Sequence, residues 1–519
     1  PSVRTAKPRL ANPIVEDKKR PTWLAVGSRM PSMEYSDSEA DVKGDRRFSG
    51  EKKEKSIWVS SLSNFSVQYN FSVIAITLKV MADKYPQNGE RREGASPPVL
   101  CENIPTHCMH AVTPPSTDWV KELLKGVVFA GAITGQLVMG YVGDLIGRNK
   151  ALCLTVSLAG IGALASGLTA WGDHYAVYGV IAATRFILGV GVGGVYPLSA
   201  TKAAEESGST DVQKRNLRVS LAFFWQTPGA LFPYVFALIL LFILPTAESQ
   251  FRVLLAAGCI PSFFILWATM NEEESSEFRN KGDQISTMEI LRDRKMMFNL
   301  LGTGGCWMIY DIVYYGTSLF SPTIVGKIFG SGDNLVKQCW QNIVVQSAGI
   351  PALVCGIYVQ QRFGTRNLQI AGFLAIAAAF FVLGLLFDPL KDSPGPLFFF
   401  YIVLMFMLNW GPNITTFILP AEVYPPKVRS TMNGISAALG KVGAIIGTFI
   451  YQPIYDEHGI PVLMVVAGCI SLIGAALSFW TIKPSKEHTG EDDTREYNTV
   501  SVEDNTDEVG HLRRVVNDQ

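Results

Sequence analysis

Twelve apolar segments, each long enough to cross a lipid bilayer, constrain this chain more than any other feature. A transmembrane helix needs about 20 apolar residues to cross roughly 30 Å of hydrocarbon. Segments of this kind lie near 57–82, 122–143, 151–171, 177–204, 217–245, 251–270, 297–325, 340–360, 368–388, 396–422, 431–453 and 460–482. We therefore expect an all-α integral membrane protein with twelve transmembrane helices. The first span has a polar face, which on a membrane helix points away from lipid.

The charged residues gather at the two ends of the chain. Residues 1–56 hold 22 of the Asp, Glu, Lys and Arg side chains and residues 483–519 hold 15, so only 12% of the 426 residues between them are charged. A soluble body of that size could not cover its surface with so few charges. The formal net charge is zero, so no basic field is available to attract nucleic acid, and we expect the lipid bilayer rather than nucleic acid as its surroundings.

Lysine and arginine predict the orientation, because cytoplasmic loops carry an excess of both. The approach to the first span and the even-numbered short loops are basic, whereas the loops at 172–176 and 454–459 contain neither residue. We therefore expect a multi-pass protein, most simply of the plasma membrane, with cytoplasmic termini. The loop at 83–121 should lie on the opposite side.

A charged loop at 271–296 divides the spans into six and six. The sequence predicts a cytoplasmic disordered N-terminal tail (1–56), an N-terminal six-helix half (57–270), the cytoplasmic central loop, a C-terminal six-helix half (297–482) and an acidic cytoplasmic tail (483–519). The halves share an Ala-Gly-Cys-Ile run, at 257–260 in span six and at 467–470 in span twelve. Such a duplication predicts a site near the midplane, between the halves.

Two opposite charges lie well inside predicted spans. Lys441 is a cation in span eleven and Asp311 is a carboxylate in span seven. Each costs at least about 2.5 kcal/mol at a helix centre unless it is paired or hydrated. Together they can neutralise each other, and an anion entering between them could take over Lys441. A purely structural ion pair is the alternative.

The loop between spans two and three carries a recognisable pattern. It reads Gly140-x-x-x-Asp144-x-x-Gly147-Arg148-x-Lys150 and matches the loop motif of the major facilitator superfamily. Its glycines allow a tight turn, and Asp144 can accept hydrogen bonds from a helix N-terminus or an arginine. An ordinary charged turn is the alternative. The corresponding second-half loop, 356–366, lacks the acidic residue, so we expect a weaker latch there.

Three further stretches resemble the phosphate symporter family of fungi and plants within that superfamily. They are GVGGVYPLSAT at 191–201, WMIYDIVYYG at 307–316, and the run from NWGPN at 409–413 through PAE at 420–422 to GISAALGK at 434–441. The resemblance covers the membrane body and not the tails. It implies the major facilitator fold, with two six-helix halves.

The resemblance also implies a phosphate site made of Tyr196, Gln226, Trp307, Asp311, Tyr315, Asn413 and Lys441. Lysine supplies the charge, and the neutral donors supply hydrogen bonds to phosphate oxygens. Phosphate keeps a P–OH near neutral pH and sulfate has none, so a carboxylate acceptor should exclude sulfate. The aromatic residues could instead only pack between helices, and the two amides could only link helices.

Five other polar residues are predicted to act in gating or structure rather than in binding. They are Asp144, Arg148, Arg185, Glu422 and Arg429. We expect Arg185, inside span four, to support packing on the cytoplasmic side of the first half. Glu422 ends span ten beside two prolines, which favours a place in a charge network at the gate over ligand contact.

This chain departs from the family at positions where the family has acidic residues. The first span of the family typically reads FFTDAYD, whereas residues 64–70 here read NFSVQYN. Val195 and Thr155 also stand where the family has acids. Asp311 remains the one obvious proton carrier, so proton coupling is in doubt, and weak coupling through Asp311, coupling to sodium and uncoupled facilitation all stay open.

The sequence therefore predicts a secondary transporter of inorganic phosphate that works by alternating access. Transport of a phosphate ester such as a glycerophosphodiester is one alternative, and a membrane phosphate sensor without flux is another. The chain has no nucleotide-binding loop, no Ser/His/Asp set placed for hydrolysis and no Cys/His cluster. We expect neither an enzyme nor a cofactor or a metal site.

Overall fold

A computed structural model describes residues 39–81, 118–172, 174–205, 212–270, 272, 274, 292–329, 334–425 and 428–483, with backbone alone for 39–56, 118–119, 121 and 174–175. The chain divides into two compact units, Pro1–Glu51 and Lys52–Gln519, and all the predicted spans lie in the second. Most of the predicted loops at 83–121 and 271–296, residues 1–38 of the predicted N-terminal tail and nearly all of the predicted C-terminal tail lie outside the described residues. Residues 39–56, predicted to be disordered, instead form the start of a helix.

Every described element is a helix, and the helices lie close to the predicted segments, except that α1 begins at Glu39, inside the predicted N-terminal tail. They are α1 (Glu39–Met81), α2 (Asp118–Ile146), α3 (Arg148–Leu168), α4 (His174–Glu205), α5 (Val212–Phe224), α6 (Gln226–Ile243), α7 (Ala247–Ala256), α8 (Cys259–Thr269), α11 (Arg294–Leu300), the π-helix η2 (Leu301–Gly305), α12 (Cys306–Phe329), α13 (Leu335–Ser347), α14 (Gly349–Phe363), α15 (Thr365–Phe387), α16 (Pro394–Trp410), α17 (Pro412–Val423) and α18 (Arg429–Thr481).

Several predicted spans are interrupted helices rather than continuous ones. Span five is α5 and α6, span six is α7 and α8, span eight is α13 and α14, and span ten is α16 and α17. Spans eleven and twelve both belong to α18. The loop predicted between them, at 454–459, is helical except at Gly459, so that prediction is wrong for most of the loop. The helix continues to Gly459, whose φ of 76° lets the chain reverse at one residue without a Cβ clash.

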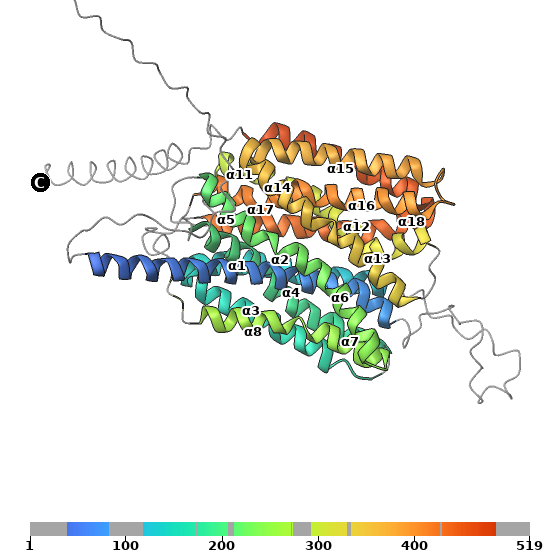
Figure 1. Cartoon of the computed structure of the whole chain (residues 1–519), viewed down its shortest axis with the longest axis horizontal. Helices are drawn as coiled ribbons and strands as arrows, with labels where there is room; N and C mark the ends of the chain where they lie inside the picture. The colour runs from blue at the N-terminus through green and yellow to red at the C-terminus, as the bar shows by residue number, and fades with distance from the viewer. Residues whose placement is uncertain are drawn as a thin grey trace, which may run out of the picture. The chain divides into compact units, whose positions relative to one another are not determined.

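The helices from α1 to α8 and those from α11 to α18 form two neighbouring groups in Figure 1. Within the first group α4 packs against α2 and α3, and within the second α18 packs against α12 and α15. Between the groups, α2 packs against α18 and α6 against α13. Small residues permit the α2–α18 contact, because a Cβ at Gly434 would lie 2.4 Å from the backbone oxygen of Gln136.

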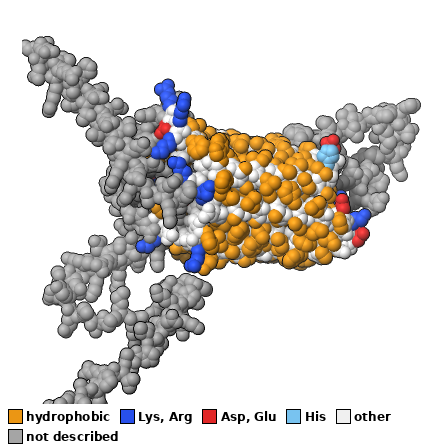
Figure 2. All heavy atoms as spheres, turned by 90° about the horizontal axis from the view of Figure 1, so that it is seen from above, with side chains coloured by type: hydrophobic (Ala, Val, Ile, Leu, Met, Phe, Trp, Pro, Cys, Tyr) orange, Lys and Arg blue, Asp and Glu red, His pale blue; other side chains and the backbone are white. Residues whose placement is uncertain are grey.

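The outer surface is suited to lipid. Among the described residues, nine helical segments are long and apolar enough to cross a membrane by length and composition, with each interrupted pair of helices and the joined α18 counted once. In Figure 2 apolar side chains cover the middle of the visible face, most Lys and Arg side chains lie toward one end, and the His and most acidic side chains lie toward the other. This distribution is typical of a multi-pass membrane protein.

The polar face of α1 is turned into the protein and away from lipid, as its sequence predicts. Its polar side chains expose no more than 3% of their surface, namely Ser60, Ser61, Ser63, Asn64, Ser66, Gln68 and Asn70. Several bond to carbonyls one turn earlier in the same helix, as Ser63 does with Val59 and Asn64 with Ser60. Interior partners satisfy others, including Ser262 on α8, which lies 3.4 Å from Ser66.

Candidate substrate site

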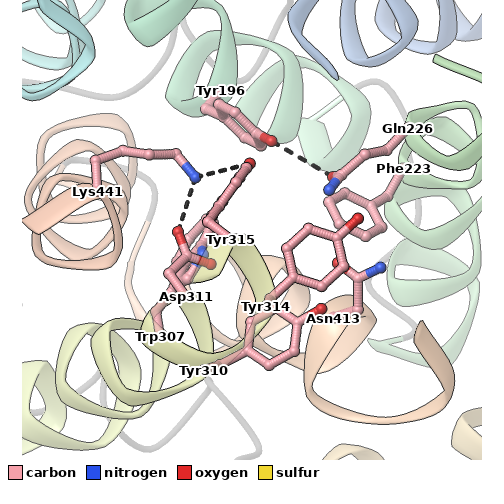
Figure 3. A pocket seen from close by; sticks show the side chains of 10 residues that line it. All are labelled: Tyr196, Phe223, Gln226, Trp307, Tyr310, Asp311, Tyr314, Tyr315, Asn413 and Lys441. Carbon is pink, nitrogen blue, oxygen red and sulfur yellow. Dashed lines mark hydrogen bonds and ion pairs between the residues drawn. The ribbon is translucent and has the colours of Figure 1, made fainter. Parts of the chain in front are cut away.

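A small cavity lies where helices of the two groups meet (Figure 3). It is lined by Tyr196 of α4, Phe223 of α5, Gln226 of α6, Trp307, Tyr310, Asp311, Tyr314 and Tyr315 of α12, Asn413 of α17 and Lys441 of α18. All seven residues of the predicted phosphate site are among them. None of the ten exposes more than 4% of its surface, so the cavity is closed on both sides.

Helical spacing explains how α12 supplies half of this lining. Trp307, Asp311 and Tyr315 follow one another at intervals of four, so they share one face of the helix. Tyr310 and Tyr314 lie beside that face. The hydroxyl of Tyr310 donates to the backbone oxygen of Leu408 at 2.9 Å, so its polar atom is satisfied against α16.

Two of the amide residues sit at helix interruptions. Gln226 is the first residue of α6, and Asn413 is the second residue of α17, directly after Gly411 and Pro412. A Cβ at Gly411 would lie 2.6 Å from the Cα of Gly372, so the chain needs glycine to approach α15 there. The Nδ2 of Asn413 donates to the Oδ1 of Asn409 at 2.9 Å. Discontinuous helices of this kind often border transporter substrate sites.

The two charges predicted to neutralise each other are in direct contact. The Nζ of Lys441 lies 2.8 Å from the Oδ2 of Asp311, and the side chains expose 1% and 2% of their surface. The same Nζ donates to the hydroxyl oxygen of Tyr315 at 3.1 Å (Figure 3). A pair so deeply buried is strongly attractive, but removing either partner leaves an uncompensated charge.

Aromatic rings surround the Lys441 ammonium. Ring centroids lie 4.3 Å away for Tyr315, 5.2 Å for Phe71 and Tyr196, and 5.9 Å for Phe129. Rings at these distances attract a cation through their negative faces. Phe71 and Phe129 come from α1 and α2, so the first group of helices holds a cation that belongs to the second. Neither phenylalanine was predicted from the sequence as part of the site.

Two hydrogen bonds orient the remaining donors. The hydroxyl of Tyr196 donates to the Oε1 of Gln226 at 3.4 Å, and that of Tyr315 donates to the Oε1 of Gln68 at 3.2 Å. Gln68 and three lining residues, Phe223, Tyr310 and Tyr314, were likewise not predicted to belong to the substrate site. Their spacing in the sequence could have pointed to two of these residues, since Tyr310 lies one residue before Asp311 and Tyr314 lies three residues after it.

The loop motif forms a buried ionic cluster away from the cavity. An NH2 nitrogen of Arg148 lies 3.1 Å from Asp144 and 2.8 Å from Glu205 at the end of α4. The Oδ2 of Asp144 also accepts from the backbone N–H and hydroxyl of Thr431, at 2.9 and 2.6 Å. Because Thr431 is in the first turn of α18, Asp144 caps a helix of the other group, where a carboxylate also favours the helix dipole.

Two acidic residues from the predicted central loop join this cluster. Glu274 accepts from the backbone N–H groups of Arg148 and Asn149 at 2.9 and 3.0 Å, so it caps the start of α3. Lys202 of α4 pairs with Glu272 and donates to the side-chain oxygen of Asn149 at 2.8 Å. The sequence alone pointed to Arg148 but not to these partners, which come from distant parts of the chain.

Glu422 occupies the corresponding place in the second group. It accepts from the Thr365 hydroxyl at 2.8 Å and from the Asn216 amide of α5 at 3.1 Å. Gly147 and Gly364 have positive φ angles of 106° and 83° at the matching turns. The described partners of Glu422 are neutral. This is consistent with the second-half loop at 356–366, which lacks an acidic residue corresponding to Asp144. Arg429 donates to the backbone oxygen of Tyr424 at 3.2 Å.

Arg185 lies in a different region from these clusters. It exposes 1% of its surface, and its guanidinium donates to the backbone oxygen of Asn70 at 2.7 Å. Along α4 it is about 30 Å from Glu205, at 1.5 Å per residue. Arg185 joins α4 to α1 within the first half, toward the end of α4 away from the Arg148 cluster. Its place on the cytoplasmic side stays a prediction.

Comparisons with known proteins agree with this architecture. The model of the Major Facilitator Superfamily matches residues 60–448 and 358–517. The inorganic phosphate transporter PT2 of Toxoplasma gondii is 37% identical over 455 residues, which cover 87% of this chain and 75% of that protein. The probable inorganic phosphate transporter 1-6 of Arabidopsis thaliana is 25% identical, over 81% of this chain and 89% of that protein. The sequence-based resemblance is confirmed.

Solved structures support the fold alone. The proton:xylose symporter XylE aligns with a TM-score of 0.64 at 17% identity, over 83% of this chain and 96% of that one. A partially occluded inward-open form of the E. coli xylose transporter aligns with a TM-score of 0.63 at 18% identity, over 84% and 99%. The predicted all-α fold is confirmed, and this chain belongs to the major facilitator superfamily.

Proposed function

We propose that this chain transports inorganic phosphate across a membrane by alternating access. The observation that carries the proposal is the closed cavity in which Lys441 and Asp311 form a buried pair surrounded by neutral hydrogen-bond donors. The names of the two relatives support phosphate as the substrate and favour it over a phosphate ester. Neither relative is named as an enzyme or as a sensor.

Phosphate would bind by taking over part of the pairing of Lys441. One anionic oxygen receives the ammonium, and uncharged donors reach the others, namely Tyr196, Gln226, Trp307 and Asn413. Tyr315 accepts from the ammonium and holds it in place, while its own proton goes to Gln68. Asp311 has only acceptor oxygens when it is ionised, so it accepts the P–OH of the ligand. A closed, water-poor cavity strengthens each of these contacts relative to bulk water.

The two halves, 57–270 and 297–482, would rock around this cavity to expose it to each side in turn. The Asp144 cap on α18 and the Glu422 contact with α5 join the halves at one end, so they hold that end closed in this state. The end richer in Lys and Arg in Figure 2 supports placing this gate, both termini and the central loop on the cytoplasmic side. We take the plasma membrane as the membrane it spans.

Reconstitution separates this proposal from its alternatives. Purified protein in proteoliposomes is given labelled phosphate, with excess unlabelled phosphate, sulfate or a glycerophosphodiester as competitors. We expect uptake that unlabelled phosphate blocks and the other two do not. Uptake blocked by the ester would indicate an ester carrier. Phosphate binding without any uptake would indicate a sensor.

Replacing Asp144 by alanine should loosen the proposed cytoplasmic gate. It removes the acceptor of two hydrogen bonds from the first turn of α18, and a lost helix cap costs about 0.5–2 kcal/mol. We therefore expect the cytoplasmic side to open about two- to thirtyfold more often, since 1.4 kcal/mol is a factor of ten. Ser430 is fully buried where α18 meets α2, so it reports opening at this contact. It is changed to cysteine in a protein from which the native cysteines have been removed. The rate at which a water-soluble maleimide labels this cysteine is then measured.

A matched control is Asp293→Ala, which removes a side chain that caps its own helix, α11. Asp293 accepts from the backbone N–H of Lys295 at 2.8 Å. This variant should leave the labelling rate of Ser430→Cys unchanged. Equal labelling rates with and without Asp144 would remove it from the gate.

Coupling is proposed to differ from that of the usual proton symporters. The positions where the family has acids are held by buried residues that do not titrate near neutral pH, namely Val67, Asn70, Thr155 and Val195. Asp311 is the remaining carboxylate in the cavity, and it is already engaged by Lys441. Three modes fit these residues: weak coupling to a proton through Asp311, coupling to a sodium ion, and uncoupled facilitation or exchange.

A proton gradient alone should therefore drive little accumulation. Proteoliposomes without sodium are given an inward pH gradient, and internal phosphate is followed until it is steady. We expect it to level off near the external concentration, with or without a protonophore. Accumulation well above that level that collapses with the protonophore would restore ordinary proton symport.

A further inference from the structure

Gln68 is a buried amide of α1 that lies directly behind the cavity wall. It exposes 1% of its surface and is not itself part of the lining. A Cβ at Gly229 of α6 would lie 3.2 Å from the Cβ of Gln68, so α1 and α6 approach closely there. This places Gln68 between the helix that carries Gln226 and the tyrosine that contacts Lys441.

Gln68 belongs to a directional chain of hydrogen bonds. The Nζ of Lys441 donates to the oxygen of Tyr315 at 3.1 Å, and the Tyr315 hydroxyl donates to the Oε1 of Gln68 at 3.2 Å. The Nε2 of Gln68 then donates to the hydroxyl of Ser72 at 3.2 Å. The chain runs from a cation of the second half of the fold to an amide of the first.

The direction of this chain matters because a phenol has a single proton. While Gln68 accepts that proton, the lone pairs of Tyr315 are left for the Lys441 ammonium. Without an acceptor at position 68, the proton is free to point elsewhere. The phenol could then compete with Lys441 for Asp311 instead of holding the ammonium in place.

We propose that Gln68 is a positioning residue for the substrate site, acting through Tyr315 on the orientation of Lys441. The inference rests on the proposed function, since it concerns how the ammonium is presented to phosphate. It adds a residue of the first helix to a charge pair that comes entirely from the second half. The bond also crosses between the halves, so it exists only while they are closed around the cavity.

A double-mutant cycle separates positioning from mere packing. Phosphate binding to the purified full-length protein is measured by calorimetry for wild type, Gln68→Met, Tyr315→Phe and the double variant. Methionine keeps the length of the side chain and removes the strong acceptor. We expect Gln68→Met to weaken binding about tenfold in the wild-type background, the usual worth of such a bond. In the Tyr315→Phe background it should cost less than about twofold, because the phenol it acts through is gone.

The matched control is Asn64→Leu, one turn earlier on the same helix. Asn64 is equally buried, but it bonds to the backbone of Ser60 and not to the site. This variant should bind phosphate like wild type. If Gln68→Met does not fold, Ser72→Ala releases the far end of the amide instead, and it should weaken binding about threefold only when Tyr315 is present.

Three results would overturn the proposal for Gln68. They are wild-type binding in Gln68→Met, an equal loss in both backgrounds, and an equal loss in Asn64→Leu. A wild-type protein that binds no phosphate would instead contradict the proposed function, and the role of Gln68 would fall with it. The wild-type titration therefore tells the two failures apart.

Discussion

Replacing Lys441 by alanine is expected to abolish phosphate binding and transport. Lys441 is the only cation among the described residues that line the cavity, and its loss leaves Asp311 as an uncompensated buried carboxylate. The contact between Lys441 and phosphate would itself be a buried charge pair, and truncating one partner of such a pair costs about 2–5 kcal/mol of binding free energy, a loss of roughly 30- to 5,000-fold in affinity. An anion would in addition face a bare negative charge. Calorimetric titration of the purified variant with phosphate measures the effect.

Lys441→Arg should lose most of the binding as well. A planar guanidinium is larger than an ammonium and donates in a fixed fork, and the four rings around Lys441 leave little room for it. The paired variant Lys441→Met with Asp311→Asn serves as a folding control, because it removes both charges together. It should restore thermal stability without restoring binding. Near wild-type affinity in Lys441→Ala would show that the site is not centred on this charge.

Asp311→Asn is expected to weaken phosphate binding but to relax the exclusion of sulfate. The carboxylate can only accept, so a ligand without a proton leaves it unsatisfied, at a cost of at least about 1–3 kcal/mol. An amide can donate as well, so a fully deprotonated tetrahedral anion becomes less unfavourable. We expect the preference for phosphate over sulfate to fall by a factor of about 10–100.

Competition of sulfate against labelled phosphate measures this preference in both proteins. Asp144→Asn is the matched control, since it makes the same change at a buried carboxylate outside the cavity. It should leave selectivity unchanged. A preference for phosphate that is equal or greater in Asp311→Asn would show that Asp311 does not detect the proton of the ligand.

Much of the site could be predicted because charge inside a membrane span is costly. Lys441 and Asp311 stand out in apolar surroundings, and two isolated charges of opposite sign are expected to meet. The resemblance to a known family supplied the neutral residues around them. Those residues line the same cavity, but their contacts with phosphate remain a proposal.

The rest of the site could not be predicted because its signal resembles ordinary packing. Phe71 and Phe129 are phenylalanines in apolar helices, and nothing local distinguishes them from core residues. Gln68 was visible as part of a polar face, but its partner Tyr315 is 247 positions away. The partners of Arg148 likewise depend on how α4 and the central loop fold back on α3.

Helix interruptions escaped prediction for a related reason. The hydropathy pattern predicts one continuous apolar span from 396 to 422. In the structure Gly411 and Pro412 break the helix beside Asn413. Proline and glycine are frequent in membrane helices, so neither residue alone marks a break. Whether a break occurs depends on the neighbouring helix, here the close approach of Gly372.

The most direct test compares phosphate uptake by wild type with uptake by the paired variant Lys441→Met with Asp311→Asn. Flux of labelled phosphate into proteoliposomes is measured, and it shows whether the buried pair is the centre of a phosphate transport site. Both proteins are reconstituted at equal amounts after their folding has been checked by thermal unfolding. We predict uptake by wild type that unlabelled phosphate inhibits, and none by the paired variant above that of empty vesicles. Equal phosphate uptake by the two proteins, or none by wild type, would contradict this role of the pair.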